Sequence, residues 1–447
     1  MSGQAKFQLT FCSSPDVPIA WISGRPIPLK QFKNDVLELA KHIEQAGGGE
    51  VLILCTRRYS FSVALLASWI ARRSAILPPD MHPATLKRIY ERHTVGCEFD
   101  QDWGESLVLE QEPELSNPRE TWLVDFAFDM DAVSIYTSGS SGEPILLKKS
   151  LGNLMSEASC LHQAFDWPSG PIVGTVPPQH LYGLTFTVLL PWVACLPWVD
   201  DIPLYPQDLS HVLSQTGAKT LVSVPAHYKA LMHDDFAPGS LFAISAAAPL
   251  DQLTATNWQA CNGQPVQEIY GSSETGVVAH RRQLENPQWR TFPSVEVAVN
   301  EGLLKVQSPF IYPSWEYAFQ TSDRAKLCGV EMFELHGRSD SIVKLGGKRT
   351  SLQEIERSLL ECDGVSEAAA LVVPVNSRVR DNAVWVVVVG EKALSVKNLR
   401  AQLQEKLDGI SIPKRFLFVD QLPRNASGKV PQQSLKALFR DNKSTYV

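Results

Sequence analysis

The first 270 residues alternate between two hydrophobic periods. Apolar residues at helical spacing predict helices over 32–43 and 61–71, and the glycines at 47–49 end the first of them. Continuous apolar runs at 51–55 and 75–77 are typical of strands buried on both faces. The pattern resumes beyond residue 170 with strands 172–176, 221–224, 241–245 and 266–270, and helices near 209–213, 226–232 and 250–260. Such alternation favours parallel sheets covered by helices.

The pattern changes after about residue 295. Short alternating runs at 301–306 and 332–335 predict hairpin strands of a small β-rich subdomain. From residue 340 onward the pattern predicts helix 352–360, strands 368–373 and 384–389, helix 399–407 and strand 416–419. We therefore predict an α/β fold with a large N-terminal domain, residues 1–339, made of helix-covered β-sheets and the β-rich subdomain. A small α+β C-terminal domain follows, residues 340–447.

Composition and charge limit the kinds of molecule that the protein is expected to bind. The chain is 44% hydrophobic and 20% charged, as is common for soluble globular proteins, and its net charge of −7 favours neither nucleic acid nor an anionic membrane. The longest apolar run, near 184–197, contains prolines and is too short to span a bilayer. The eight cysteines are scattered without a CxxC pair, and no signal-like stretch opens the sequence. We expect a cytoplasmic protein with no nucleic-acid partner and no membrane span.

A hydroxyl- and glycine-rich run, Tyr-Thr-Ser-Gly-Ser-Ser-Gly-Glu-Pro at 136–144, directly follows the apolar residues 132–135. Glycine permits unusual backbone angles, so such a run can point several N–H groups and hydroxyls at one anion. A solvated Ser/Gly linker is the alternative. A strand in front and a helix behind, with Ser150 as its N-cap, favour a phosphate loop.

Five blocks in a fixed order resemble the adenylate-forming superfamily of acyl-CoA synthetases, luciferases and adenylation domains. The blocks are 136–144, Tyr-Gly-Ser-Ser-Glu at 270–274, Thr-Ser-Asp at 321–323, Gly-Arg-Ser-Asp at 337–340 with Lys344, Gly347, Arg349 and 354–356, and Pro-Arg-Asn-Ala-Ser-Gly-Lys at 423–429. The resemblance covers nearly the whole chain. It implies an AMP-forming ligase that uses ATP and Mg²⁺ to convert a small carboxylic acid into an acyl-adenylate.

The resemblance also implies a nucleotide site. The ATP-binding residues would be Thr137, Ser138, Gly139, Ser140, Ser141, Gly142, Ala246, Ala247, Tyr270, Gly271, Ser273, Asp323 and Arg338. The 137–142 loop would hold the outer phosphates, Tyr270 and the 246–249 segment would flank adenine, and Asp323 would accept from the ribose hydroxyls. Ile145 departs from the family pattern, which usually has lysine there. Lys148 and Lys149 are candidates to replace its charge, or are ordinary surface charges.

Three residues would be catalytic: Lys429, Glu274 and His180. Glu274 matches the family's Mg²⁺-linked carboxylate. His180 lies in a His-x-x-Gly segment that resembles the one lining the carboxylate end of the acyl pocket, which implies a role in positioning the carboxylate or gating the thiol channel. A core histidine is the alternative. Lys429 matches the lysine that touches carboxylate and α-phosphate.

The position of Lys429 in the small domain implies a hinge. The family places this hinge at Asp340, and rotation about it would bring Gly347 and Arg349 to a thiol channel.

Two further segments bear on the identity of the acid substrate and of the thiol acceptor. The runs Ala-Trp-Ile-Ser-Gly-Arg-Pro at 20–26 and Pro-Pro-Gln-His-Leu-Tyr-Gly-Leu at 177–184 resemble compact ligases of aryl-polyene and xanthomonadin pigment clusters. This implies a 4-hydroxybenzoate-like aryl acid and an acyl carrier protein whose phosphopantetheine thiol accepts the acyl group. Free CoA as acceptor, or a fatty acid as substrate, is the alternative, and a non-catalytic nucleotide-binding homologue is a third. A P-loop phosphotransferase is disfavoured because the loop lacks the Gly-Lys-Ser/Thr ending.

Overall fold

The computed structural model describes residues 6–13, 18–104, 120–138, 144–232, 236, 238–339, 342–345, 348–374, 382–391, 394–407, 409, 411–425 and 428–441. Its contacts divide the chain into two compact units. Unit 1 comprises Met1–Val297, Lys305–Phe319 and Cys328–Met332, and unit 2 comprises Ala298–Leu304, Gln320–Leu327 and Phe333–Val447.

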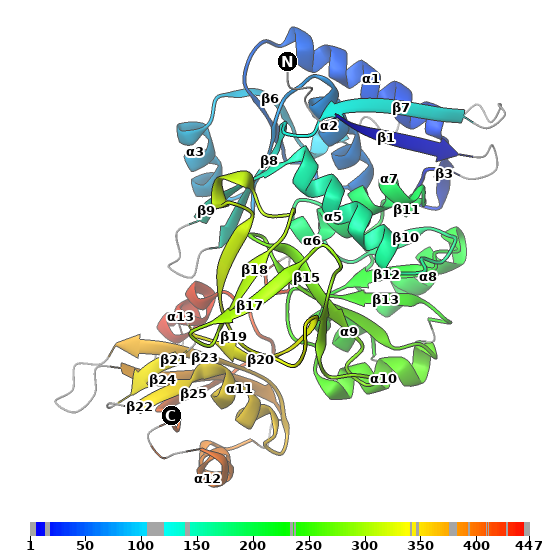
Figure 1. The fold of residues 1–447 in the computed structure, drawn as a ribbon. Helices are drawn as coiled ribbons and strands as arrows, with labels where there is room; N and C mark the ends of the chain where they lie inside the picture. Colours follow the sequence, from blue (N-terminus) through cyan, green and yellow to red (C-terminus); the bar gives the residue numbers. More distant parts are fainter. Residues whose placement is uncertain are drawn as a thin grey trace. The chain divides into compact units, whose positions relative to one another are not determined.

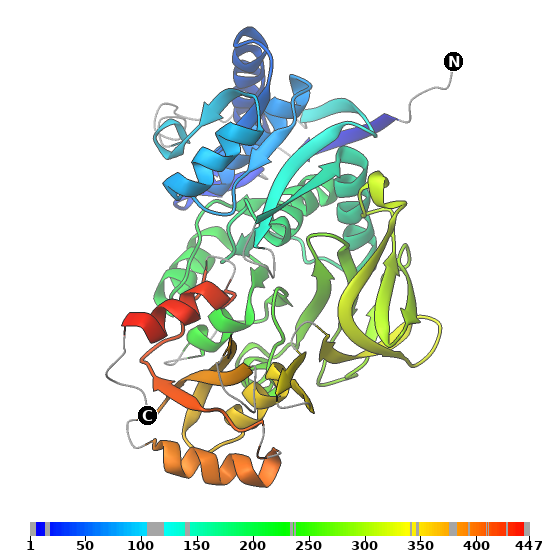
Figure 2. The same ribbon diagram turned by 90° about the vertical axis from the view of Figure 1, so that its left-hand side faces the viewer.

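The first sheet of unit 1 carries the candidate phosphate loop. Its strands, in spatial order, are β6 (Val95–Phe99), β4 (Glu50–Ile53), β5 (Ala75–Leu77), β8 (Asp131–Ser138) and β9 (Pro144–Ser150). Only β9 runs antiparallel to its neighbour. Figure 2 shows the helices of this region, in blue, around these strands: α1 (Leu29–Gln45), α2 (Arg58–Ile70) and α3 (Pro83–Arg92). The apolar centres of β4 and β5 are fully buried, as predicted for strands covered on both faces.

A two-stranded antiparallel ribbon, β1 (Lys6–Ser13) with β7 (Glu120–Ala127), was not predicted from the sequence. Phe11 of β1 stacks on Trp122 of β7, with ring centroids 5.1 Å apart, and meets Phe32 of α1 edge-on at 5.8 Å. These buried rings extend the core of unit 1, because aromatic pairs bury large areas in fixed geometry.

The second sheet of unit 1 is larger (Figure 1). Nine strands of this sheet, in spatial order, are β16 (Trp289–Thr291), β15 (Gly276–Arg281), β14 (Val266–Ser272), β13 (Phe242–Ser245), β12 (Thr220–Ser223), β10 (Ile172–Gly174), β11 (Trp198–Val199), β2 (Ala20–Ile22) and β3 (Arg25–Ile27). From β14 to β2 the strands are parallel, so the carboxyl ends of β10, β12, β13 and β14 meet at one edge. Ligands of open α/β sheets bind at such edges.

Helices connect the strands of the second sheet. They are α5 (Leu151–Ala164), α6 (Leu181–Leu184) with a π-helical turn (Thr185–Leu189) and α7 (Leu190–Ala194), α8 (Pro206–Thr216), α9 (Pro225–Leu231) and α10 (Gln252–Asn262). The predicted N-cap Ser150 is confirmed: its hydroxyl accepts from the Asn153 N–H at 3.1 Å, and Asn153 Oδ1 accepts from the Ser150 N–H at 3.0 Å.

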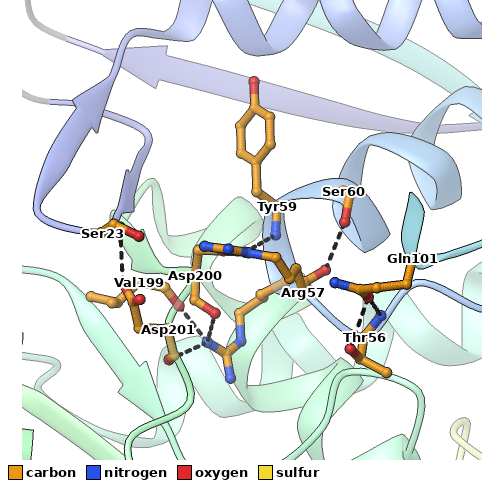
Figure 3. A network of polar contacts seen from close by, with 10 residues as sticks. Ser23, Thr56, Arg57, Tyr59, Ser60, Gln101, Val199, Asp200 and Asp201 are labelled. Atoms are coloured by element: carbon orange, nitrogen blue, oxygen red, sulfur yellow. Dashed lines mark hydrogen bonds and ion pairs between the residues drawn. The ribbon is translucent and has the colours of Figure 1, made fainter. Parts of the chain in front are cut away.

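A buried polar network joins the two sheets of unit 1 (Figure 3). Asp200, directly after β11, accepts from Arg57 Nε at 2.6 Å and from the Tyr59 N–H at 2.7 Å. The fully buried Arg58 donates to carbonyls at the carboxyl ends of strands β11 and β10. Its acceptors include the Val199 carbonyl of β11 and, at 3.1 Å, the Gly174 carbonyl of β10. Burial lowers the pKa of Arg58 to about 10, and the nearby carboxylates oppose that shift. The network fixes the strand ends, where unpaired carbonyls would be costly.

Strands β17 (Glu296–Asn300), β18 (Leu303–Gln307), β19 (Ala318–Leu327) and β20 (Met332–Arg338) carry residues of both units and correspond to the predicted β-rich subdomain. A short 3₁₀ turn, Pro313–Trp315, lies between β18 and β19.

The remainder of unit 2 is a compact α+β body. Its elements are β21 (Ile342–Leu345), β22 (Lys348–Ser351), α11 (Leu352–Leu360), β23 (Val365–Pro374), β24 (Asn382–Gly390), α12 (Val396–Lys406), β25 (Arg415–Phe418) and α13 (Gln432–Asp441). Alternate residues of β24 face two cores, one with α11 and α12 and the other with α13. The predicted α/β class with a smaller α+β part is thus confirmed, whereas the domain boundary at 339/340 stays a prediction.

Within the described residues, no helix is both long and apolar enough to cross a membrane.

Candidate active site

The predicted phosphate loop joins β8 to β9. The backbone of Thr137 and Ser138 belongs to β8 and pairs with Ile145 and Pro144 of β9, so the hairpin brings both ends of the loop together. Residues 139–142 lie outside the described part of the chain. Their phosphate contacts therefore stay a prediction.

Tyr136, the first residue of the loop motif, is held by a hydrogen-bonded chain that the sequence did not predict. His93, the C-cap of α3, has Nε2 2.7 Å from the Tyr136 hydroxyl and Nδ1 2.5 Å from Glu50 Oε2. Glu50 also accepts from Ser134 Oγ at 3.2 Å. Because these groups come from three elements, the contacts tie the start of the loop to the first sheet.

The two lysines of β9 have opposite environments. Lys148 is exposed and donates to Asp131 at 3.1 Å across the hairpin. Lys149 is 1% exposed, and its Nζ donates to the backbone carbonyls of Glu274 at 3.0 Å and Phe310 at 2.7 Å. Both of these hydrogen-bond acceptors are protein groups. Lys149 therefore contacts the turn that carries Glu274, whereas the sequence suggested either a contact with the loop phosphates or a surface charge.

The predicted adenine-flanking residues lie at the carboxyl ends of adjacent parallel strands. Ala246 and Ala247 follow β13, and Tyr270 lies in β14, which pairs with β13 in parallel register. Ala247 has φ +74°, a left-handed conformation that costs a non-glycine residue free energy and is often found at functional sites. The Tyr270 ring packs against Trp289 of β16, with centroids 5.6 Å apart. The sheet thus brings the small segment and the aromatic ring to one edge.

The turn between β14 and β15 carries Glu274. Gly271, near the end of β14, has no room for a side chain, because a Cβ there would lie 2.3 Å from the Gly276 carbonyl oxygen. Ser272 Oγ accepts from the Thr275 N–H at 3.2 Å, and Thr275 Oγ1 accepts from the Ser272 N–H at 3.1 Å. These reciprocal bonds close the turn and present Ser273 and Glu274 at its tip, both partly exposed.

The Glu274 carboxylate fits the expected role of a Mg²⁺ ligand. No hydrogen bond or ion pair joins its oxygens to another group in the described chain, so they are available to a hard cation, which prefers oxygen ligands. The described residues contain no group of three or more His, Cys, Asp or Glu able to hold a metal. A cation at Glu274 would therefore take further ligands from phosphate oxygens and water, and would neutralise phosphate charge.

The His180 segment enters α6 at the same edge of the second sheet. His180 is the N-cap of α6, and Tyr182 Oη donates to the Ser223 carbonyl at 2.8 Å, at the end of β12. Gly183 packs so closely that a Cβ would lie 2.0 Å from the Pro177 carbonyl oxygen. The segment is therefore fixed against the strand ends rather than extended into solvent.

A polar cluster beside this segment was missed by sequence reasoning. Thr175 Oγ1 lies 2.7 Å from Ser223 Oγ and 2.8 Å from His227 Nδ1. Ser245 Oγ, at the end of β13, is buried and has no hydrogen-bond partner among the described residues. Thr175, Ser245 and the nearby pair Ser223 and His227 come from three separate parts of the sequence, and each resembles an ordinary Ser, Thr or His until the sheet topology places them at one edge.

Asp323 and Arg338 are brought together in unit 2. They face each other in the β19–β20 register, and Arg338 Nη1 lies 3.4 Å from Asp323 Oδ1. The Asp323 side chain is 16% exposed and the Arg338 side chain 45% exposed. A carboxylate held beside a guanidinium at a β-bulge can accept from neighbouring hydroxyls, so the geometry is compatible with the predicted ribose contact.

Lys429 is held by backbone hydrogen bonds within unit 2. The Lys429 N–H donates to Asn425 Oδ1 at 2.9 Å, and its carbonyl accepts from the Asn425 N–H at 2.8 Å. Gly428 has φ +76°, and its carbonyl accepts from Arg424 Nη1 at 2.8 Å. The backbone of the lysine is thus held, while its side chain is exposed.

Other predicted residues of unit 2 are only partly described. Asp340 and Gly347 lie outside the described residues, and Arg349 is placed by its backbone in the β21–β22 hairpin, opposite Lys344. The hinge and thiol-channel roles stay predictions.

Comparison with known proteins identifies the class. The profile of the AMP-binding enzyme family matches residues 15–308, and that of the AMP-binding enzyme C-terminal domain matches residues 354–429. The chain therefore belongs to the AMP-binding enzyme family and is a ligase.

Individual relatives agree with this assignment. The chain is similar to 4-coumarate–CoA ligase of Rhodobacter capsulatus, 27% identical over 296 residues, covering 66% of this chain and 73% of the relative. It is 23% identical to malonate–CoA ligase of Arabidopsis thaliana, covering 93% and 74%. The fold matches ATP-bound MatB from Rhodopseudomonas palustris with a TM-score of 0.79 at 21% identity, covering 95% of this chain and 97% of that chain.

Proposed function

We propose that this ligase adenylates a 4-hydroxybenzoate-like aryl acid with ATP and Mg²⁺ and transfers the acyl group to a phosphopantetheine thiol, preferably that of an acyl carrier protein. The observation that carries the adenylation step is the edge of the second sheet. There Ala246, Ala247 and Tyr270 end adjacent strands, and Glu274 follows on a closed turn with its carboxylate available.

The chemistry proceeds in two displacements. A carboxylate oxygen of the acid attacks the α-phosphorus, the bond to pyrophosphate breaks, and an acyl-adenylate forms. A thiolate then attacks the acyl carbon and AMP leaves with the bridging oxygen. Positioning and charge neutralisation supply most of the catalysis in the first step. We assign charge neutralisation to Lys429 and to the Mg²⁺ that Glu274 would hold, carboxylate positioning to His180, and ribose contacts to Asp323 with Arg338.

The polar cluster Thr175, Ser223, Ser245 and His227 supports a hydroxyl-bearing acid. These side chains gather beside the His180 segment, where the resemblance predicts the acyl pocket. A buried Ser245 hydroxyl with no hydrogen-bond partner among the described residues favours a ligand that can hydrogen-bond to it, because an unpaired buried polar group is costly. A purely aliphatic chain would leave the Ser245 hydroxyl unpaired.

Two similarities support the aromatic character of the acid. The segments at 20–26 and 177–184 resemble ligases of pigment clusters, and one relative is named for 4-coumarate. The alternative acceptor, free CoA, is favoured by the relatives that are named CoA ligases. We infer a cytoplasmic enzyme of pigment or polyketide-type biosynthesis, and a reducing compartment agrees with eight cysteines that form no disulfide in the described part of the chain.

An acid panel tests the proposal. The enzyme is incubated with MgATP, one acid, and either CoA or a holo acyl carrier protein, and the thioesters are identified by mass spectrometry. We expect 4-hydroxybenzoate to exceed benzoate by about 100-fold in kcat/KM, since a site that pairs a hydroxyl rejects the analogue lacking it. Turnover of fatty acids without turnover of any aryl acid would overturn the substrate assignment. Exclusive use of CoA would overturn the preferred acceptor.

A further inference from the structure

Lys149 is a buried cation beside the candidate metal-binding turn. Its Nζ donates to the Glu274 carbonyl at 3.0 Å and to the Phe310 carbonyl at 2.7 Å. The first contact fixes the peptide group from which the Glu274 side chain starts. The second fixes a neighbouring segment that α5 also holds, because Asn153 Nδ2 donates to the carbonyls of Pro309 and Ile311 at 2.7 and 3.0 Å.

Glu157 of α5 is a second buried charged residue beside the turn, and it is called with Lys149 the buried pair. It is 2% exposed, and its Oε1 accepts from the Val277 N–H at 2.9 Å, directly after the turn. A Cβ at Gly276 would lie 3.1 Å from Glu157 Cδ and 2.9 Å from Phe310 Cβ, and Gly276 has φ +70°. The turn thus rests on Lys149 at Glu274 and on Glu157 at Val277.

Burial of this pair has a physical cost. Burial lowers the pKa of Lys149 to about 8, while Glu157 and Glu274 oppose the shift, and burial raises the pKa of Glu157. Apolar residues often replace buried ion pairs without loss of stability. The stability of the fold therefore does not require charged residues at positions 149 and 157. Their hydrogen bonds to the Glu274 carbonyl and the Val277 N–H do fix the position of the turn.

The neighbouring elements connect this pair to the nucleotide site. Lys149 lies in β9, which begins where the predicted phosphate loop ends, and Glu274 lies on the turn after β14. The Glu274 carboxylate has no hydrogen bond to the described chain, so its position depends on its backbone.

We propose that Lys149 and Glu157 are positioning residues that hold the Glu274 carboxylate where the metal–nucleotide complex binds, without touching substrate themselves. The inference rests on the proposed adenylation function. It gives the two lysines of β9 different roles. Lys149 holds the backbone of the proposed metal ligand Glu274, while Lys148 forms a surface ion pair with Asp131.

The main test is a double-mutant cycle on ligand affinity. Lys149→Met, Glu274→Gln and the double variant are titrated calorimetrically with MgATP and, separately, with AMP without metal. We expect Lys149→Met to weaken MgATP binding about tenfold, since loss of an outer-shell partner typically costs 10–100-fold in metal affinity. AMP affinity should stay within twofold. Because Lys149 acts through Glu274, the double variant should bind MgATP no more weakly than Glu274→Gln alone.

Two control variants separate positioning from folding. Lys148→Met, on the same strand, should leave both affinities unchanged. Lys149→Met with Glu157→Leu removes both buried charges. It should recover thermal stability relative to Lys149→Met but keep the weak MgATP binding, because the Glu274 carbonyl still lacks its donor.

Several outcomes would overturn the inference: equal losses of AMP and MgATP affinity, no loss of either, or additive losses in the cycle. If wild-type enzyme binds AMP and forms acyl-adenylate while Lys149→Met is unaffected, only the inference fails. If the wild type binds no MgATP, the proposed function fails with it.

Discussion

Lys148 and Lys149 are adjacent in β9, but Lys148 is exposed and Lys149 is buried. The sequence alone does not distinguish the two. Strand alternation puts one residue of any such pair on the covered face, but the register that decides which one depends on the pairing with β8. The same holds for Thr175, Ser223, Ser245 and His227, whose proximity depends on the parallel pairing of β10, β12 and β13. Residue identities at motifs were predictable, whereas their partners were not.

Asp35 gives a prediction at the residue scale. This 3% exposed carboxyl group of α1 accepts from Tyr59 Oη at 2.6 Å, and burial raises its pKa from 3.8 to about 6. A folded-state pKa above the unfolded one means that the group's stabilisation is present below pH 3.8 and is lost as pH rises through 6.

The variant Asp35→Asn should therefore flatten the fall in thermal stability between pH 4 and 6.5 and should be relatively more stable at pH 7. Differential scanning fluorimetry across this pH range measures the effect. Glu44→Gln, on the exposed face of α1, is the matched control. Parallel pH profiles for wild type and Asp35→Asn would refute the assignment.

At the scale of elements, the predicted strands and helices of the parallel sheets were confirmed because each has a strong local pattern. Strand β5 of the first parallel sheet occupies its predicted residues 75–77, and in the α+β body of unit 2 helix α11 occupies its predicted residues 352–360. The β1–β7 ribbon was missed because its two strands lie more than 100 residues apart and gain their stability from Phe11 packed on Trp122. The α6–α7 segment was read only as an apolar run, since burial on all sides removes helical periodicity.

Gly183 gives a prediction for the α6 element. A helix normally gains stability when glycine becomes alanine. Here the added Cβ would lie 2.0 Å from the Pro177 carbonyl oxygen, so Gly183→Ala should destabilise the protein by about 1–3 kcal/mol, as overpacking does. It should also raise KM for the acid, because the His180 segment must move.

Thermal unfolding and steady-state kinetics measure these two effects. Gly329→Ala is the control, since a Cβ there meets no atom within 4 Å. Unchanged stability and unchanged KM in Gly183→Ala would show that the segment adjusts freely.

At the scale of the whole molecule, the contacts assign Glu274 to unit 1 and Asp323, Arg338 and Lys429 to unit 2. The expectation that these residues serve one reaction comes from the five ordered motifs and from the family to which the chain belongs. Hydrophobic periodicity predicted two kinds of domain, but it carries no information about domain motion. The hinge at Asp340 therefore depends on resemblance alone.

Lys429→Ala tests the division of labour between the two steps. Removing the ammonium should reduce adenylation by about 100-fold or more, as expected for loss of a preorganised group at developing charge. Transfer from a supplied acyl-adenylate to the thiol should stay within a few fold of wild type. Pyrophosphate release and thioester formation are measured separately, with Lys436→Ala as the control. Equal losses in both steps would contradict the two-position mechanism.

The proposed reaction begins when a carboxylate attacks the α-phosphorus of ATP. Turnover of a carboxyl-¹⁸O-labelled 4-hydroxybenzoate with MgATP and thiol, followed by mass spectrometry of the nucleotide and phosphate products, tests this step. We expect AMP carrying one ¹⁸O atom, together with unlabelled pyrophosphate. Formation of ADP with the label in inorganic phosphate, or of AMP without label, would contradict it.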